Sequence, residues 1–185
     1  MNNYARISQK LRLTSVVGIL ALGQAYAETA DGLNYTASYP YGFGMYPPEG
    51  VEITGHANAP VELQIPEQLS IFISYPWPGS EQLLPVVSIG ERAFANSTSL
   101  AKIILPNTLK RIEQSAFAGC TSLASVTLPE SLNGIESNTF EGCTSLTQIT
   151  LPNETNYIGW GAFEGCENLA TINIGDDFNG VGDQY

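Results

Sequence analysis

The chain has 185 residues, of which 43% are hydrophobic, and a formal net charge of −11. This length suits one domain with a real hydrophobic core, and the strong negative charge excludes nucleic acid and anionic membrane surfaces as favoured partners. One histidine and an odd count of three cysteines do not suit a histidine-based metal site or a disulfide framework.

Residues 1–27 have the organisation of an export signal. Three basic residues precede an apolar run from Leu13 to Leu22, and Ala25-Tyr26-Ala27 supplies the small residues that a signal peptidase requires. The run is too short to span a bilayer, and no second run of about 18 apolar residues follows, so no transmembrane span is predicted. Cleavage would remove three of the seven basic residues and none of the eighteen acidic ones, which leaves a net charge of −14. We expect an exported protein that is secreted, displayed on the cell surface or kept in the periplasm.

Residues 28–85 are predicted to be an N-terminal cap that leads into a repeat region. Tyr and Phe alternate with Pro and Gly between residues 31 and 50, which predicts an irregular lid. Its aromatic rings either cover the first repeat or form a sugar-stacking patch. Val51 to Thr54 and Val61 to Ile65 alternate apolar and polar residues, which predicts two short strands arranged like a β-hairpin.

A loop is predicted between this cap and the first full repeat. Ile89 follows Pro66 by 23 residues, whereas six separate the equivalent positions of the later repeats. The excess contains Tyr75 to Gly79, a Pro-rich turn with Trp77 at its tip. The exposed Trp is either a contact point or a side chain folded back onto the edge of the repeats.

Residues 86–185 repeat with a period of 23 residues, in about four units with a truncated fifth. A Phe is followed by Leu six residues on, by Ile or Val nine on, and by Leu or Ile eleven on. The period and the L-x-x-[IV]-x-[LI] pattern predict a leucine-rich repeat solenoid with one short parallel strand per unit and a turn or short helix on the opposite side. The repeating Phe residues are Phe94, Phe117, Phe140 and Phe163.

Stacking of these units at the strand spacing of about 4.8 Å would place equivalent residues in continuous ladders. The last predicted strand, near Thr171 to Ile174, would be an edge strand with unpaired backbone groups. The sequence therefore predicts either end-to-end self-association or a chain that is longer in nature.

The cysteines Cys120, Cys143 and Cys166 occupy one position of the repeat, where Ser97 stands in the first unit. We interpret them as small buried residues with free thiols, since Ser fits the same position. A bridge between adjacent repeats is the alternative, and a metal site is disfavoured because no His or acidic column joins them.

Three segments indicate which type of leucine-rich repeat the chain contains. They are Ile89 to Phe94, Ala116 to Leu123 and Phe140 to Leu146. They resemble the BspA-like leucine-rich repeats of bacterial and protozoan surface proteins, whose pattern is I-G-x-x-A-F-x-G-C-x-S-L-x-x-I-x-[LI]-P. The resemblance is strong over residues 86–185 and extends weakly back to Asp31. It implies a surface-exposed protein, some relatives of which contact host matrix or other cells.

The sequence holds no catalytic motif. His56 lies in a Gly/Asn/Pro loop, and no G-x-S-x-G, P-loop or G-x-G-x-x-G sequence occurs. We therefore expect no enzyme activity, metal or cofactor. Two hypotheses remain: an exported adhesion module that binds a protein or glycan at the cell surface or outside the cell, and a self-assembling structural component of the envelope or surface.

The predicted binding face consists of the outward residues of the repeat strands. These residues are short and polar, and only one of them is charged, although the chain is strongly acidic. A solvated strand also favours short polar residues, so this is the competing interpretation. The predicted face is Lys102, Ile104, Ser125, Thr127, Gln148, Thr150, Thr171 and Asn173.

Overall fold

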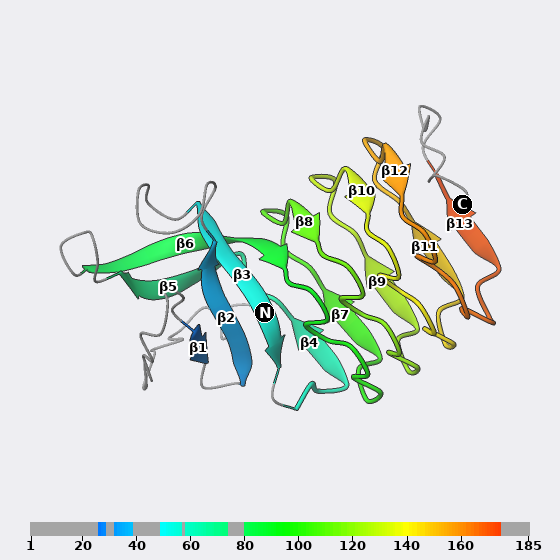
Figure 1. Cartoon of the computed structure of the whole chain (residues 1–185), viewed down its shortest axis with the longest axis horizontal. Coiled ribbons are helices and arrows are strands. Elements are labelled where there is room, and N and C mark those ends of the chain that lie inside the picture. The colour runs from blue at the N-terminus through cyan, green and yellow to red at the C-terminus, as the bar shows by residue number, and fades with distance from the viewer. Residues whose placement is uncertain (1–25, 29–31, 39–48, 57, 74–79, 175–185) are drawn as a thin grey trace, which may run out of the picture.

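The computed structural model describes residues 26–28, 32–38, 49–56, 58–73 and 80–174. These residues form thirteen short β-strands joined by turns, and none of them is helical. The molecule is elongated, with a mixed sheet at its N-terminal end followed by a stack of coils (Figure 1). No described segment is a helix that could cross a membrane.

Several predicted features lie outside the described residues. They are most of the export signal, most of the aromatic lid, the Pro-rich turn at Tyr75 to Gly79 and the truncated fifth repeat. Strand β1 (Tyr26–Glu28) contains the residues on both sides of the predicted cleavage position and pairs with Asn34 to Thr36. Export and cleavage therefore stay predictions.

The N-terminal sheet has the strand order β1-β2-β3-β6-β5. Strand β6 pairs in parallel with β3 and also with β8 (Arg111–Ile112), whereas the other neighbours are antiparallel. Alternate residues of the central strands point into the core, where Leu33, Tyr35, Val51 and Ile53 are buried. The further strands are β2 (Leu33–Ser38), β3 (Gly50–His56), β5 (Gln68–Ile73) and β6 (Ser80–Ile89).

Both strands predicted at Val51 to Thr54 and Val61 to Ile65 exist, within β3 and as β4 (Glu62–Gln64). The predicted hairpin pairing between them is wrong. Strand β4 pairs in parallel with β7 (Lys102–Ile104) instead. It does so because Leu63 lies opposite Ile103 and packs into the same core, so β4 is the first rung of the solenoid.

The predicted insertion before the first full repeat is an antiparallel hairpin. Leu69 and Ile89 are buried at positions equivalent to Leu109 and Ile112 of the next coil, yet 20 residues separate them instead of three. The additional residues extend β5 and β6, which pair from Gln68 opposite Pro85 outward. The hairpin projects from the N-terminal end of the coils (Figure 1).

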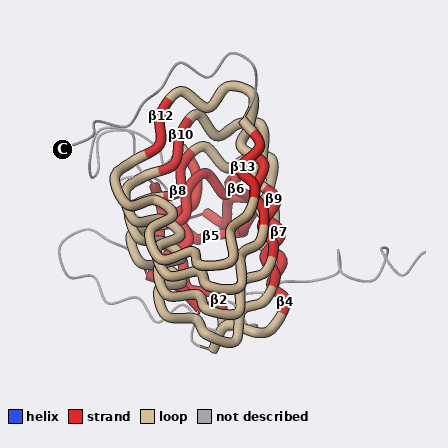
Figure 2. The backbone as a smooth tube through the Cα atoms, turned by 90° about the vertical axis from the view of Figure 1, so that its right-hand side faces the viewer, coloured by secondary structure: helices blue, strands red, loops and turns tan. Residues whose placement is uncertain are grey.

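Each coil carries two strands on opposite sides (Figure 2). The strands expected from the repeat pattern form one side, which we call the front ladder: β4, β7, β9, β11 and β13. A second side, the back ladder, contains β6 and three strands of two residues each. The prediction of one strand per unit is therefore incomplete, since a two-residue strand buries too few side chains to leave a periodic signal. The remaining bounds are β8 (Arg111–Ile112), β9 (Ser125–Thr127), β10 (Gly134–Ile135), β11 (Gln148–Thr150), β12 (Tyr157–Ile158) and β13 (Thr171–Asn173).

The predicted Phe ladder is confirmed. Neighbouring rings from Phe94 to Phe163 stack with centroids 5.5, 5.5 and 5.7 Å apart and planes within 5° of parallel. Phe94, Phe117 and Phe140 are fully buried. Stacked rings at coil spacing join each unit to the next, so no unit needs to bury its own core.

The chain crosses between the back and front ladders in a tight turn with two left-handed residues per coil. In the coil that contains Phe117 these are Ser115, with φ 56°, and Gly119, with φ 72°. Between them Phe117 N–H donates to the Thr139 carbonyl of the next coil at 3.0 Å. The turns are thus hydrogen-bonded to each other along the axis, as the strands are.

The three cysteines are free thiols within this stack. The Sγ–H of Cys120 donates to the Phe94 carbonyl at 3.0 Å, and Cys143 and Cys166 repeat this contact one and two coils on. Burial raises the pKa of Cys120 to about 11. The interpretation as small buried thiols is confirmed for Cys120 and Cys143, whereas Cys166 is a free thiol that is only partly buried. Each thiol donates to a carbonyl of the preceding coil.

Candidate binding surface

The front ladder places all eight predicted face residues outward. In β7, β9 and β11 the central residue is buried and its two neighbours are exposed, which is the alternation of a half-buried strand. The core residues beneath are Ile103, Val126 and Ile149, whereas Ile172 of β13 stays 38% exposed. The sequence therefore identified correctly which residues of β7, β9 and β11 face solvent, whereas in β13 Ile172, which the repeat pattern places inward, is exposed as well.

Strand register arranges these residues in two parallel columns. Lys102 lies opposite Ser125, and Ile104 lies opposite Thr127. Gln148 lies opposite Thr171, and Thr150 lies opposite Asn173. We call these eight residues, together with Glu62 and Gln64 of β4, the polar strip.

Glu62 and Gln64 belong to the polar strip but were missed from the sequence. They pair with Lys102 and Ile104, respectively, and both are exposed. The sequence does contain the repeat pattern here, because Glu62 to Pro66 has the same apolar spacing before a proline as Lys102 to Pro106. Its place before the first full repeat favours a cap, and only the parallel pairing of β4 with β7 assigns these side chains to the strip.

The strip is divided into two hydrogen-bonded blocks. Strands β4, β7 and β9 form one sheet, and β11 and β13 form another. Within the second block the Asn173 Nδ2 donates to Thr150 Oγ1 at 3.2 Å. This is the one side-chain hydrogen bond between strip residues that the described part of the chain contains. Most of the strip's hydroxyl and amide groups are therefore directed to solvent.

Charge is concentrated at the first two rungs of the strip. Glu62 and Lys102 are the charged members, and the described residues form no ion pair between them within 4.0 Å. Ile104, 43% exposed, provides an apolar position beside them. From β9 onward the strip contains only hydroxyl and amide side chains.

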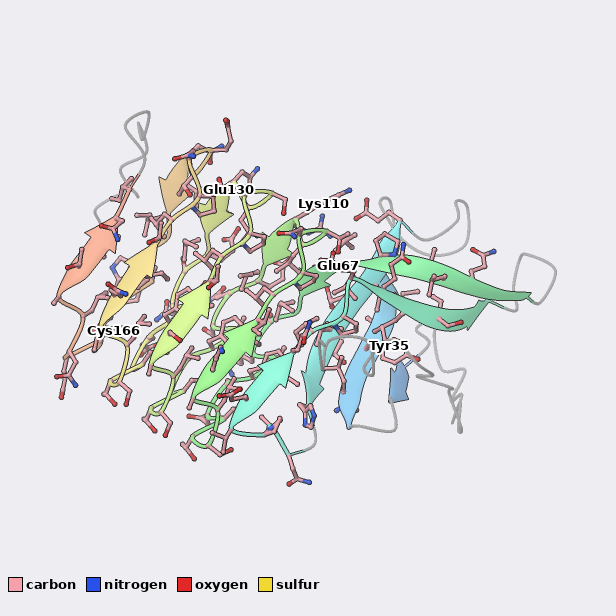
Figure 3. The ribbon with its side chains drawn as sticks, turned by 180° about the vertical axis from the view of Figure 1, so that it is seen from behind. Tyr35, Glu67, Lys110, Glu130 and Cys166 are labelled. Carbon is pink, nitrogen blue, oxygen red and sulfur yellow. The ribbon has the colours of Figure 1, made fainter. Side chains whose placement is uncertain are left out.

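One border of the strip carries carboxylates, which we call the acidic rim: Glu67, Glu130 and Glu154. Glu67 Oε1 accepts from Asn107 N–H at 3.2 Å, and Glu130 Oε2 accepts from Asn153 N–H at 3.3 Å. Each of these contacts joins one coil to the next across the turn that follows the front strand. Figure 3 labels Glu67 and Glu130 of this border, together with Lys110, which directly precedes β8.

The back ladder carries a polar network that is closed upon itself. Arg111 lies 3.3 Å from Glu49 and 3.4 Å from Glu113. Burial raises the pKa of Glu113, although the adjacent Arg111 opposes this effect. The Arg111 cation therefore offsets part of the cost of placing carboxylates on neighbouring rungs.

Two further polar side chains of the back ladder are also partnered. Ser88 Oγ donates to Glu52 at 3.2 Å, and Tyr157 donates its hydroxyl hydrogen to Glu136. Burial, with Glu136 as a further cause, raises the pKa of Tyr157. These two contacts join neighbouring strands, so the groups that make them stabilise the stack of coils.

The described residues contain no cluster of three or more His, Cys, Asp or Glu side chains suited to a metal ion. His56 lies at the end of β3, and its Nδ1 accepts from Asn58 N–H at 3.2 Å. The cysteine pKa values are raised by burial, which suppresses the thiolate that nucleophilic chemistry requires.

The two ladders, the stacked Phe column and the 23-residue coil define a leucine-rich repeat protein. The sequence model for the BspA type leucine-rich repeat region matches residues 82–185 in six copies. The chain belongs to this family, as its repeat segments predicted. None of the curated proteins matches it.

Solved structures of leucine-rich repeat proteins share the fold. A protein from Bacteroides ovatus is 24% identical with a TM-score of 0.62, over 80% of this chain and 43% of that one. A protein from Bacteroides capillosus is 22% identical with a TM-score of 0.64, over 80% and 97%. The leucine-rich repeat protein of T. pallidum is 25% identical with a TM-score of 0.53, over 78% and 80%. The chain thus spans less than half of the Bacteroides ovatus protein.

Proposed function

We propose that the protein is an exported, non-enzymatic binding module that holds a protein partner on the polar strip. The observation that carries this proposal is the uneven placement of charge. The chain has a net charge of −11, yet from β9 onward the strip has no charged member. Surface charge serves solubility, so a neutral face on a strongly acidic protein is suited to contact with another molecule.

The display of the strip supports binding at modest entropic cost. Its side chains project from hydrogen-bonded parallel strands over buried Ile103, Val126 and Ile149. Ser and Thr have few rotamers to lose, so ordering them in a complex costs less than ordering long charged side chains. Hydroxyl and amide groups supply donors and acceptors, which suits the polar groups of a protein surface.

The test uses a defined probe, a phage-displayed library of random peptides selected on the folded protein. Binders are compared on the wild-type chain and on a triple variant, Thr127→Lys with Gln148→Lys and Thr150→Lys. We expect the triple variant to lose at least roughly tenfold in affinity, because long cations replace short hydrogen-bonding groups at the centre of the strip.

A matched control distinguishes the loss of strip contacts from a general effect of added positive charge. Gln114→Lys with Thr98→Lys and Thr121→Lys makes the same charge change at exposed neutral positions that lie off the front ladder and outside the acidic rim. This variant should bind the selected peptides as the wild type does. Equal binding by the strip variant and the wild type, with circular dichroism showing both folded, would refute the assignment of the site to the strip.

A further inference from the structure

The basic residues of the repeat region are confined to one coil. Arg92, Lys102, Lys110 and Arg111 are the four Lys and Arg residues that follow residue 27. From Ile112 to Ile174 the chain contains seven Glu residues and no Lys, Arg or His. The coils that carry β9, β11 and β13 therefore have an uncompensated negative field, although the strip itself is neutral there.

Part of this charge borders the strip directly. Glu130 follows Thr127 by three residues and Glu154 follows Thr150 by four, after the proline that ends each front strand. Both carboxylates are exposed. One oxygen of Glu130 accepts from the Asn153 N–H, and its other oxygen has no hydrogen bond or ion pair with the described residues; Glu154 has none through either oxygen.

The rim is not uniform along the axis. In the first coil the position of Glu130 is taken by Asn107, and Lys110 follows it just before β8, so this coil has a cation and no carboxylate where the next two have Glu130 and Glu154. A positively charged group is therefore attracted to Glu130 and Glu154 and is repelled from the first coil. The neutral hydrogen-bonding columns and the acidic border coincide only over β9, β11 and β13.

We propose that the partner of the strip is a polypeptide segment carrying Lys or Arg, which lies over β9, β11 and β13 with a basic side chain against Glu130 and Glu154. This inference rests on the proposed function and adds the charge and position of the partner. Charge complementarity favours a cationic segment, and the strip has no aromatic side chain on which a sugar ring stacks. The strip limits dissociation, and the rim accelerates association.

The experiment uses peptides selected from the random library on the wild-type chain. We expect them to be enriched in Lys and Arg relative to the unselected library. On a rim variant, Glu130→Gln with Glu154→Gln, the association rate constant at low salt should fall roughly three- to tenfold while the dissociation rate changes little, as for charges at the edge of an interface. Raising the salt from about 0.05 to about 0.5 M should slow association to the wild type more than to the rim variant.

The matched control is Glu91→Gln with Glu164→Gln, which removes the same charge from exposed positions outside the rim and the strip. It should leave association within about twofold of the wild type, since screening limits distant charges. Selected peptides without basic enrichment, or equal effects of the rim and control variants, would overturn the proposal. If the strip variant still abolished binding in that case, the proposed function would stand and only the cationic partner would fail.

Discussion

Replacing Phe117 by Ala tests the ladder on which the solenoid depends. The Phe117 ring is fully buried and stacks on Phe94 and Phe140, with both centroids 5.5 Å away. Truncation removes the ring's buried area, leaves a cavity and breaks two ring contacts. We expect the free energy of unfolding to fall by about 4 kcal/mol, within the usual range for a buried Phe changed to Ala.

Phe163 provides a matched comparison at the same position of a later coil. Its ring is partly exposed and stacks on Phe140 alone among the described residues, at 5.7 Å. Phe163→Ala should cost about 2 kcal/mol, since less area and one ring contact are lost.

Urea unfolding followed by far-ultraviolet circular dichroism measures both variants. The slope against urea concentration should match that of the wild type, so that midpoints are comparable. Equal costs for Phe117→Ala and Phe163→Ala would refute the reasoning, because the argument depends on the number of stacked neighbours and on burial.

Three further predictions concern single positions. Thr155 stands where earlier coils have Leu109 and Leu132, and its hydroxyl is buried without a hydrogen-bond partner among the described residues. Thr155→Val should therefore raise the free energy of unfolding by roughly 1 kcal/mol, and a lower urea midpoint would contradict this. Gly119 and Gly142 have similar positive φ values of 72° and 68°, but a Cβ at Gly119 would lie 2.5 Å from Asn96 Oδ1 whereas the nearest atom at Gly142 is 3.7 Å away. Because Asn96 is exposed and its side-chain oxygen can move away, Gly119→Ala and Gly142→Ala should lower the free energy of unfolding by similar amounts, the backbone cost of about 1 to 2 kcal/mol, and a much larger loss at Gly119 in thermal unfolding would contradict this. Burial raises the pKa of Cys120 from 9.0 to about 11, so its contribution to stability is complete below pH 9 and is lost as pH rises through 11. The unfolding free energy of the wild type should fall more steeply across that range than that of Cys120→Ala, and parallel curves would show that the thiol is not buried.

The repeat region was predictable because its signal is local and periodic. Phe, Leu and Ile recur every 23 residues, and a column of identical residues has few alternatives to stacking upon itself. The same alternation identified which side chains of β7, β9 and β11 face solvent, since successive residues of a strand point to opposite sides.

Tertiary structure decided what depends on pairing between distant segments. Val51 to Thr54 and Glu62 to Gln64 both look like strands, but no local feature reveals that the first joins β2 and β6 while the second joins β7. The back ladder was missed for a related reason: its short strands contribute few inward residues, and the ladder exists only through bonds between coils. Sequence alone determined the period and the two faces of each front strand, because these follow from the order of side chains along one chain. The place of Glu62 and Gln64 on the strip, and the alignment of Glu130 beside it, came from the register of stacked coils, which depends on the free energy of packing the whole solenoid.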